Sequence, residues 1–124
     1  MSLPARIRRD LAPPPKREPR PGDSKAHTRW LKTLPCVVCG LPADDPHHLL
    51  GNLDGLPKGM GRRAEDRWAV PLCRRDHNAA HAAGDDEAWF ASLGIEARSL
   101  ASALWRSSGD DQAGERIVFR ARQR

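Results

Sequence analysis

Residues 35–40 read Pro-Cys-Val-Val-Cys-Gly, and residues 71–81 read Pro-Leu-Cys-Arg-Arg-Asp-His-Asn-Ala-Ala-His. Between these stretches stand two adjacent histidines, His47 and His48. All three cysteines of the chain and four of its five histidines therefore fall between residues 36 and 81. Thiolates and imidazoles are common zinc ligands in proteins. We therefore expect this part of the sequence to fold around metal ions.

The spacing of these residues allows two arrangements of ligands. Cys36 and Cys39 form a C-x2-C pair, which points two thiolates at one tetrahedral ion. Cys73, at the start of a predicted helix, supplies a third thiolate. In the first arrangement a single zinc ion also takes either Asp76 or His77, and the other histidines are incidental.

The second arrangement has two centres. Asp76, on the first turn of the same helix, completes the cysteine site with a carboxylate oxygen. His77 and His81 are four residues apart, so they lie on one helix face and bind a separate ion together with His47. Successive side chains alternate along a strand, so His48 points elsewhere and is free to act as a base.

The composition agrees with a small domain that needs such ions. The chain has 124 residues, the size of one domain, and only 22 of them are Leu, Ile, Val or Phe. A core this lean usually needs a metal, disulfides or a partner. Three cysteines cannot all pair within one chain, which argues for a reducing, cytoplasmic compartment. No apolar run resembles a membrane span or a secretory signal.

The net charge of +5 comes from the two ends of the chain. Residues 1–29 carry a net charge of +5, residues 30–115 of −4 and residues 116–124 of +4. Residues 4–22 contain six prolines and are expected to form an extended arm. Such an arm suits a polyanion, because phosphate contacts need no fixed geometry, or it is a solubilising tail. Its candidate DNA-binding residues are Arg6, Arg8, Arg9, Lys16, Arg17 and Arg20.

The remaining pattern predicts an α+β domain of short elements. Ser24 is expected to cap a helix that runs to about Thr33, and Asp85 or Asp86 a later helix. His27 belongs to no motif and is expected at the surface. Further helices are expected over 74–83 and 96–107, short strands ending near 50 and 72, a glycine-rich loop over 51–63, and a short strand or docked tail over 116–120.

The C-x2-C pair, the His-His pair and the Leu-Cys-x3-His-x3-His run, in this order, resemble the HNH, or ββα-metal, nuclease superfamily. The runs at residues 59–61, 81–84, 89–90 and 94–95 are similar to a phage and prophage branch of it. That branch includes the recombination-enhancing, RecA-dependent nuclease. The resemblance covers about residues 30–105 and does not include the basic arm.

The resemblance implies a role for each matching residue. His48 matches the general base of the superfamily. The implied ligands are His47, His77 and His81 for a catalytic ion, and Cys36, Cys39, Cys73 and Asp76 for a structural zinc ion. Asp76 stands where the superfamily usually has Cys or His. The asparagine that orients the base has no clear equivalent, and Asp66, Asn52 or a main-chain carbonyl could replace it, with Asp66 favoured.

The fold class that follows is α+β: a zinc-stapled ββα-metal (HNH) domain over residues 24–107 with additional C-terminal helices. A basic, proline-rich, disordered arm is expected over residues 1–23, and a basic tail or short strand over residues 108–124. The implied activity is metal-dependent hydrolysis of DNA phosphodiester bonds. Arg62, Arg63 and Arg74 are candidate phosphate contacts, with a solvated surface as the other explanation of these arginines.

The implied catalytic ion is Mg²⁺, Mn²⁺, Ni²⁺ or Zn²⁺. The expected partners are DNA and a recombinase filament, with no membrane, for a monomer or weak dimer in the cytoplasm of a bacterial or phage-infected cell. One alternative is a non-catalytic zinc module that binds nucleic acid or protein, and another is a small structural protein whose ends dock on a larger assembly.

Overall fold

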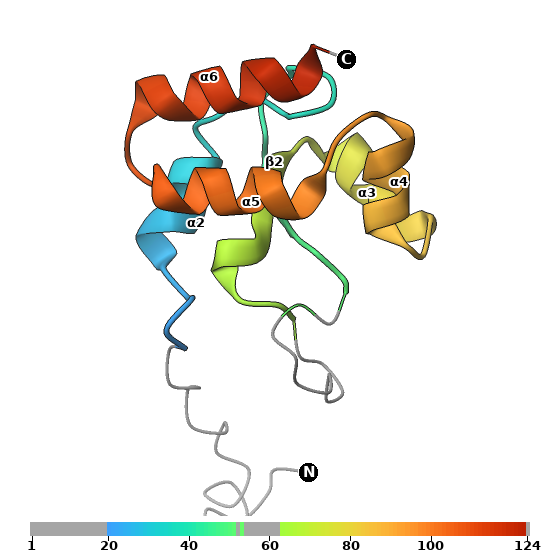
Figure 1. The fold of residues 1–124 in the computed structure, drawn as a ribbon, viewed down its shortest axis with the longest axis horizontal. Helices are drawn as coiled ribbons and strands as arrows, with labels where there is room; N and C mark the ends of the chain where they lie inside the picture. The colour runs from blue at the N-terminus through green and yellow to red at the C-terminus, as the bar shows by residue number, and fades with distance from the viewer. Residues whose placement is uncertain (1–19, 52, 54–62, 124) are drawn as a thin grey trace, which may run out of the picture.

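The computed structural model describes residues 20–51, 53 and 63–123. Over these residues the chain forms five α-helices, one 3-10 helix and a two-stranded sheet, which make a small α+β fold (Figure 1). Their order is α2 (Lys25–Leu31), β1 (Asp45–His48), η1 (Asp66–Trp68), β2 (Ala69–Leu72), α3 (Arg74–Ala82), α4 (Asp86–Ser92), α5 (Ala97–Arg106) and α6 (Asp111–Arg122). None of the helices in these ranges is long and apolar enough to cross a membrane.

The sheet directs the two adjacent histidines to different surroundings. β1 and β2 are antiparallel, with His47 opposite Val70 and His48 opposite Ala69. Because side chains alternate along a strand, His47 is fully buried while His48 keeps part of its side chain exposed. The two histidines are therefore available to two different sites.

Side-chain caps begin the helices that carry or flank these sites. Ser24 caps α2 and Asp85 caps α4, each through a side-chain oxygen that accepts a backbone N–H. Cys73 caps α3, and its Sγ accepts a hydrogen bond from the backbone N–H of Asp76. The third cysteine is thus fixed at the start of the helix that also contains His77.

One apolar cluster joins the sheet to the helices. Its largest fully buried members are Phe90, Leu31, Leu49, Leu72 and Leu104. α5 packs against η1, β2, α4 and α6, so it lies at the middle of the domain (Figure 1). α3 packs against both strands. The core therefore holds α3, β1 and β2 in fixed positions relative to one another.

Residues 111–122 form α6, so a strand at 116–120 is wrong, and the docked tail that was the other expectation is a helix. Asp110 caps this helix, whose buried residues are Gly114 and Val118, four positions apart. The β-branched and aromatic residues 117–119 favour a strand by propensity, but a helix places only part of this run against the core. Tertiary packing therefore overrides the local preference.

α6 packs closely on α2. A Cβ added at Gly114 would lie 2.6 Å from Trp30 Cζ2 and 3.0 Å from Leu34 Cδ2. Trp30 Nε1 also donates a hydrogen bond to Asp111 Oδ1 at 2.9 Å. The absence of a side chain at residue 114 is what permits this approach of the two helices.

Residues 20–23, expected to belong to the basic arm, are part of the folded domain. The backbone N–H of Gly22 donates to Glu65 Oε2 at 2.7 Å, and its carbonyl accepts from Arg67 N at 2.9 Å. Arg20 forms an ion pair with Asp23 at 3.2 Å. The other predicted basic residues, Arg6, Arg8, Arg9, Lys16, Arg17 and Arg62, lie outside the described residues, as does most of the loop expected over 51–63.

Candidate metal centres

The three cysteines and Asp76 come together in one cluster. Cys39 Sγ lies 3.7 Å from Cys73 Sγ, and Asp76 Oδ2 lies 3.3 Å from Cys36 Sγ and 3.2 Å from Cys73 Sγ. All four ligand atoms lie within 4.8 Å of one another. Two cysteines come from the turn before β1, and the other two residues from the start of α3.

These separations fit a tetrahedral zinc ion. With Zn–S of about 2.3 Å and Zn–O of about 2.1 Å, the edges of the tetrahedron are about 3.8 Å between sulfurs and about 3.6 Å between sulfur and oxygen. The observed distances lie close to these edges, the sulfur–oxygen ones slightly shorter. Residues Cys36, Cys39, Cys73 and Asp76 therefore form a group that could hold a metal ion.

The local backbone explains how the first two cysteines converge. Gly40 N donates to the carbonyl of Cys36 at 3.0 Å and closes a tight turn. Gly40 has φ of +81°, a conformation that glycine adopts without strain. The backbone N–H of Val38 points at Cys36 Sγ at 3.4 Å. This N–H donor is suited to stabilise a metal-bound thiolate.

Burial changes the acid–base properties of the cluster. It raises the pKa of the Cys36 thiol to about 12. Burial opposes ionisation of Asp76, but hydrogen bonds from the Cys73 and Cys36 thiols hold the pKa of this carboxyl below its usual value. A carboxylate among neutral thiols is the state expected without a cation, and a metal ion would displace the thiol protons.

A second group consists of His47 from β1 with His77 and His81 from α3. One nitrogen from each ring lies within 4.8 Å of the other two. His47 Nδ1 and His77 Nδ1 are 3.2 Å apart, close to the edge of about 3.3 Å for two imidazoles on one zinc ion. The exposure rises from buried His47 to exposed His81, so one side of the group is open to solvent. Three ligands with an open side are typical of catalytic rather than structural sites.

The two groups are separate, because His77 lies with the other histidines and not with the cysteines. The side chains therefore form two separate groups of candidate ligands, and occupation of either group by an ion stays a prediction. Burial, with smaller effects of His47 and His81, lowers the pKa of His77. A neutral imidazole is the form that binds a metal ion.

Asp86, at the first position of α4, supports the histidine group. Its Oδ2 lies 2.8 Å from His47 Nε2 and accepts the backbone N–H of Leu50 at 2.9 Å. A proton on His47 Nε2 leaves Nδ1 free to bind an ion, and carboxylates commonly orient ligating histidines in this way. From the sequence, Asp86 is expected only as a possible helix cap. No local spacing in the sequence pairs Asp86 with His47.

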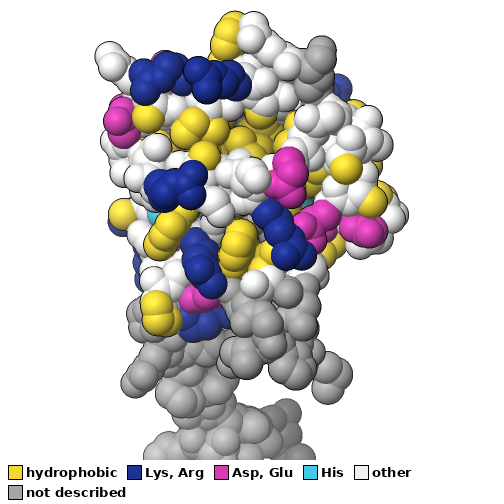
Figure 2. All heavy atoms as spheres, in the orientation of Figure 1, with side chains coloured by type: hydrophobic (Ala, Val, Ile, Leu, Met, Phe, Trp, Pro, Cys, Tyr) yellow, Lys and Arg dark blue, Asp and Glu magenta, His cyan; other side chains and the backbone are white. Residues whose placement is uncertain are grey.

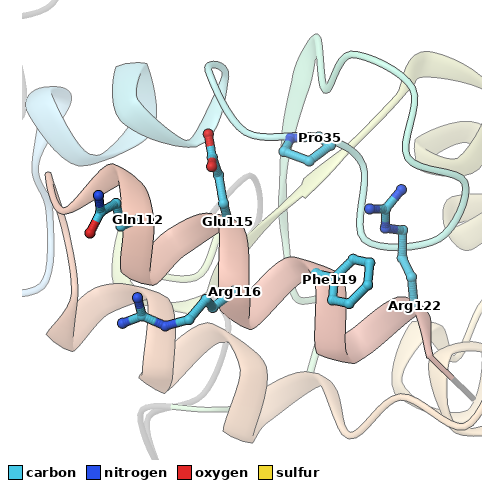
Figure 3. Close-up of a pocket in the computed structure, with 6 residues that line it drawn as sticks. All are labelled: Pro35, Gln112, Glu115, Arg116, Phe119 and Arg122. Atoms are coloured by element: carbon cyan, nitrogen blue, oxygen red, sulfur yellow. The ribbon is translucent and has the colours of Figure 1, made fainter.

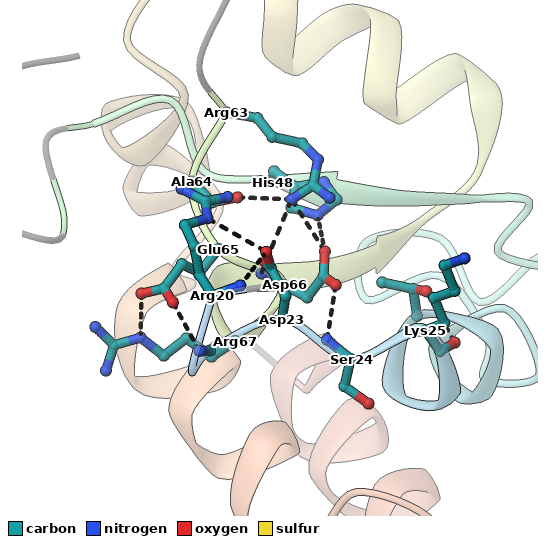
Figure 4. A network of polar contacts seen from close by, with 12 residues as sticks. Arg20, Asp23, Ser24, Lys25, His48, Arg63, Ala64, Glu65, Asp66 and Arg67 are labelled. Carbon is teal, nitrogen blue, oxygen red and sulfur yellow. Dashed lines mark hydrogen bonds and ion pairs between the residues drawn. The ribbon is translucent and has the colours of Figure 1, made fainter. Parts of the chain in front are cut away.

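His48 pairs with Asp66 at a third location (Figure 4). His48 Nε2 lies 2.8 Å from Asp66 Oδ1, as expected for a base and its orienting acceptor. Asp66 Oδ2 accepts the backbone N–H of Ser24 at 2.9 Å, and Asp23 Oδ1 accepts the backbone N–H of Asp66 at 3.1 Å. These bonds fix the carboxylate. Asn52, the other candidate for this role, lies outside the described residues.

The surroundings of His48 favour its neutral form. Burial lowers the pKa of His48, against the opposing effect of its hydrogen bond to Asp66. With Nε2–H donated to the carboxylate, Nδ1 carries the free lone pair. The pair therefore has the composition of a general base and the group that orients it.

A family model described as "Protein of unknown function (DUF968)" matches residues 12–108, most of the chain. The chain belongs to the DUF968 family. The DUF968 segment contains both ligand groups and the His48–Asp66 pair, whereas α6 follows it. These three clusters therefore lie within the segment that the family model matches.

This DUF968 chain also resembles "Uncharacterized protein YdfU" of Escherichia coli strain K12. The two are 56% identical over 55 residues, which is 44% of this chain and 15% of that relative. The match therefore covers only a small part of the relative's length. No solved structure matches the DUF968 chain at a significant level.

Two of the predicted DNA-binding residues, Arg20 and Arg63, lie within the described part of this DUF968 protein. Arg63 Nη1 is 3.1 Å from Asp66 Oδ1 and 3.7 Å from Asp23 Oδ1 (Figure 4). About half of the Arg63 side chain, 53%, remains exposed. Arg63 therefore contacts the carboxylate that orients His48, and is still accessible to an anion from outside.

His27 is buried, with 1% of its surface exposed, so its expected place at the surface is wrong. Its Nδ1 lies 2.7 Å from Ser108 Oγ, and its ring packs edge-on against Trp105 with centroids 4.8 Å apart. Burial lowers the pKa of His27. In this DUF968 fold the histidine is a core residue, buried by partners about 80 positions later in the chain.

Proposed function

We propose that this DUF968 protein is a metal-dependent DNA endonuclease of the HNH, or ββα-metal, type. The observation that carries the proposal is the pairing of His48 with Asp66 next to a histidine group that could hold an ion. His47 and His48 are consecutive, so their Cα atoms are about 3.8 Å apart. One short strand thus supplies both an ion ligand and a candidate base.

The residues have complementary tasks in this proposal. His47, His77 and His81 would hold the ion, which when bound supplies positive charge for the phosphate and the departing 3′ oxygen. His48 accepts a proton from the attacking water at Nδ1, and Asp66 stabilises the imidazolium that results. General-base catalysis of this kind contributes about 10²- to 10⁴-fold to a rate.

The cysteine group has a structural part in the proposal. A zinc ion held by Cys36, Cys39, Cys73 and Asp76 would join the turn before β1 to the start of α3. α3 carries two of the three histidine ligands, so this staple fixes their position relative to β1. It also compensates for the small number of bulky apolar residues.

The remaining features of the proposal follow the resemblance to HNH nucleases. The substrate is DNA, the catalytic ion is Mg²⁺, Mn²⁺, Ni²⁺ or Zn²⁺, and the protein acts as a monomer or weak dimer in the cytoplasm. A phage or prophage origin and a recombinase filament as partner belong to the same proposal. Arg63 is the described arginine best placed to contact the scissile phosphate, because it lies beside His48 and Asp66.

The test is a plasmid-nicking assay with each of the four ions, combined with elemental analysis of the purified protein. We expect two metal ions per chain and nicking that His48→Ala reduces by about 10²- to 10⁴-fold. Lys32→Ala, a change on the exposed surface, is the matched control and should nick normally. Both variants should melt like the wild type. Equal nicking by His48→Ala, or no nicking by the wild type with any of these ions, would overturn the proposal.

A non-catalytic zinc module that binds nucleic acid or protein is the second candidate. The observation in its favour is that His47 is fully buried and already has partners at both nitrogens, Asp86 and His77. A histidine with such partners can serve the core without an ion. This candidate predicts one zinc ion per chain and no cleavage.

A further inference from the structure

The exposed side of α6 combines an aromatic ring with arginines. Phe119 is 52% exposed and is one of two large apolar side chains exposed among the described residues. Arg116 and Arg120 are both exposed, and Arg116 lies between the other two side chains around the helix, three positions before Phe119 and four before Arg120. The guanidinium of Arg122 lies 5.9 Å from the centroid of the Phe119 ring.

A groove runs beside this ring. Its volume is 540 Å³, and it is lined by Pro35, Gln112, Glu115, Arg116, Phe119 and Arg122 (Figure 3). Its lining combines the Phe119 ring and Pro35 with two guanidinium groups and a single carboxylate, that of Glu115. Figure 2 shows Lys and Arg side chains gathered over α6, with hydrophobic side chains below them.

α6 is firmly attached to the domain beneath this surface. Gly114 lies against Trp30, and Asp111 accepts a hydrogen bond from the Trp30 indole. At the other end, the guanidinium of Arg122 packs on Gly40, in the turn that carries Cys36 and Cys39. The surface is therefore preorganised, and a ligand would not have to pay for ordering the helix.

Charge and shape together identify the class of ligand. Residues 116–123 contain three arginines and no acidic residue, so the surface suits a polyanion. An exposed ring among cations is the combination with which proteins bind single-stranded nucleic acid, because each unpaired base offers a face for stacking. In a duplex the bases are stacked on each other, so they present no free face to the Phe119 ring. The surface thus favours an unpaired strand.

We propose that the exposed side of α6 binds single-stranded DNA, with Phe119 stacked on an unpaired base and Arg116 and Arg120 in contact with phosphates. The inference rests on the proposed function for the choice of DNA and deepens it by naming the form of the substrate. α6 lies outside the segment that the DUF968 model matches, so the proposal concerns this chain. The groove beside Phe119 accommodates the next base or sugar.

The experiment measures binding of a fluorescent 15-nucleotide oligo(dT) and of a matched duplex by anisotropy, over a range of salt concentrations and without catalytic ions. Phe119→Leu keeps an apolar side chain but removes the ring, so we expect oligo(dT) affinity to fall at least about fivefold and duplex affinity to stay the same. Phe119→Trp should bind at least as well as the wild type. All of these side chains are exposed, and the variants should keep the wild-type melting temperature.

The charge contribution is tested separately. Arg116→Gln combined with Arg120→Gln should lower the salt dependence, d log K/d log[salt], by about 1.4. The control combines Arg29→Gln with Arg106→Gln, two exposed arginines on α2 and α5, and removes the same charge. It should leave oligo(dT) binding within about twofold of the wild type. Glu115→Gln removes the single carboxylate of the groove and should strengthen binding.

Two outcomes would overturn the inference: Phe119→Leu binds oligo(dT) as tightly as the wild type, or the control pair weakens binding as much as the α6 pair. The first outcome would also be expected if the surface serves to bind an apolar peptide, because a leucine can replace the ring in such a contact. Nicking is measured independently on the same proteins. If the protein nicks DNA but the α6 substitutions leave oligo(dT) binding unchanged, only this inference is contradicted. If the α6 substitutions weaken oligo(dT) binding but the protein does not nick DNA, only the nuclease proposal is contradicted.

Discussion

His47 Nε2 lies 2.8 Å from Asp86 Oδ2, and both side chains are almost completely buried. The contact joins β1 to the first residue of α4 and turns His47 Nδ1 toward His77. Burial opposes ionisation of Asp86, yet the hydrogen bonds from His47 and Leu50 hold the pKa of this carboxyl below its usual value. The carboxylate therefore remains charged and fixes both the tautomer and the angle of the ligand.

Replacing Asp86 should weaken ion binding by the histidine group. We expect Asp86→Ala to lower the affinity for Ni²⁺ or Zn²⁺ at this group by about 10- to 100-fold, the usual cost of losing a carboxylate that supports a histidine ligand. Titration calorimetry measures this affinity. Asp85→Asn keeps the cap of α4 and is the matched control, with unchanged affinity. An Asp86→Ala protein that binds as tightly as the control would contradict the assigned role.

Asp66→Asn tests whether the carboxylate orients the base. An amide can present its NH₂ group to His48 and stabilises the imidazolium less, so nicking should slow by about 10²- to 10⁴-fold in kcat with little change in KM. Asp44→Asn, an exposed acid before β1, should leave both constants unchanged. A loss confined to KM would instead assign Asp66 to DNA binding.

Asp76→Cys should tighten zinc binding at the cysteine cluster. Asp76 Oδ2 already lies 3.2–3.3 Å from two sulfurs, and a thiolate there completes a four-sulfur set, which is softer than one with a carboxylate. Competition with a chromophoric chelator measures the affinity. Asp44→Cys adds the same residue on the exposed surface and should not tighten binding. Weaker binding by Asp76→Cys than by the wild type would show that the site requires the smaller oxygen ligand.

His27 should make stability depend on pH. Burial lowers the pKa of His27 below its ordinary value of 6.5, so below that pH the unfolded chain binds a proton that the folded chain does not. The stability from the neutral ring is complete above pH 6.5 and is lost as the pH falls toward the folded pKa. His27→Gln removes this titration. Urea unfolding between about pH 7.5 and 5 should show a shallower loss of stability in this variant, and parallel curves would contradict the assignment.

Gly114→Leu should destabilise the domain through the contact with Trp30. A Cβ at residue 114 is already 2.6 Å from Trp30 Cζ2, so the larger side chain forces α6 away from α2. Overpacking costs about 1–3 kcal/mol, more than the gain of about 1 kcal/mol from replacing a helical glycine. Gln112→Leu introduces the same residue at an exposed position of α6 and should stay within about 0.5 kcal/mol of the wild type. Thermal unfolding of the two variants measures the difference.

The sequence was most informative where chemistry and spacing coincide. Cys36 and Cys39 at C-x2-C spacing and the histidines four apart in α3 are local patterns, and the structure brings each set together with its distant partners. Ser24 and Asp85 were predictable as caps for the same reason, because a cap acts within three residues. Whether ions occupy the two groups stays a prediction.

The features missed by the sequence analysis depend on tertiary packing. Asp86 became a partner of His47 because α4 packs against α3, which no local spacing indicates. His27 is buried by Trp105 and Ser108 from the other end of the chain. α6 forms where β propensity favours a strand, because Gly114 permits its approach to Trp30.

α3 and its cap carry residues of both ligand groups: Cys73 caps the helix, Asp76 and His77 are consecutive near its start, and His81 lies in its last turn. The two groups therefore share one short helix. An ion bound by the cysteine group orders the start of α3, so less conformational entropy is lost when the histidine group binds its own ion. Thermodynamic linkage makes such an effect reciprocal. The protein would then bind its two ions cooperatively, with positive coupling in either order of addition.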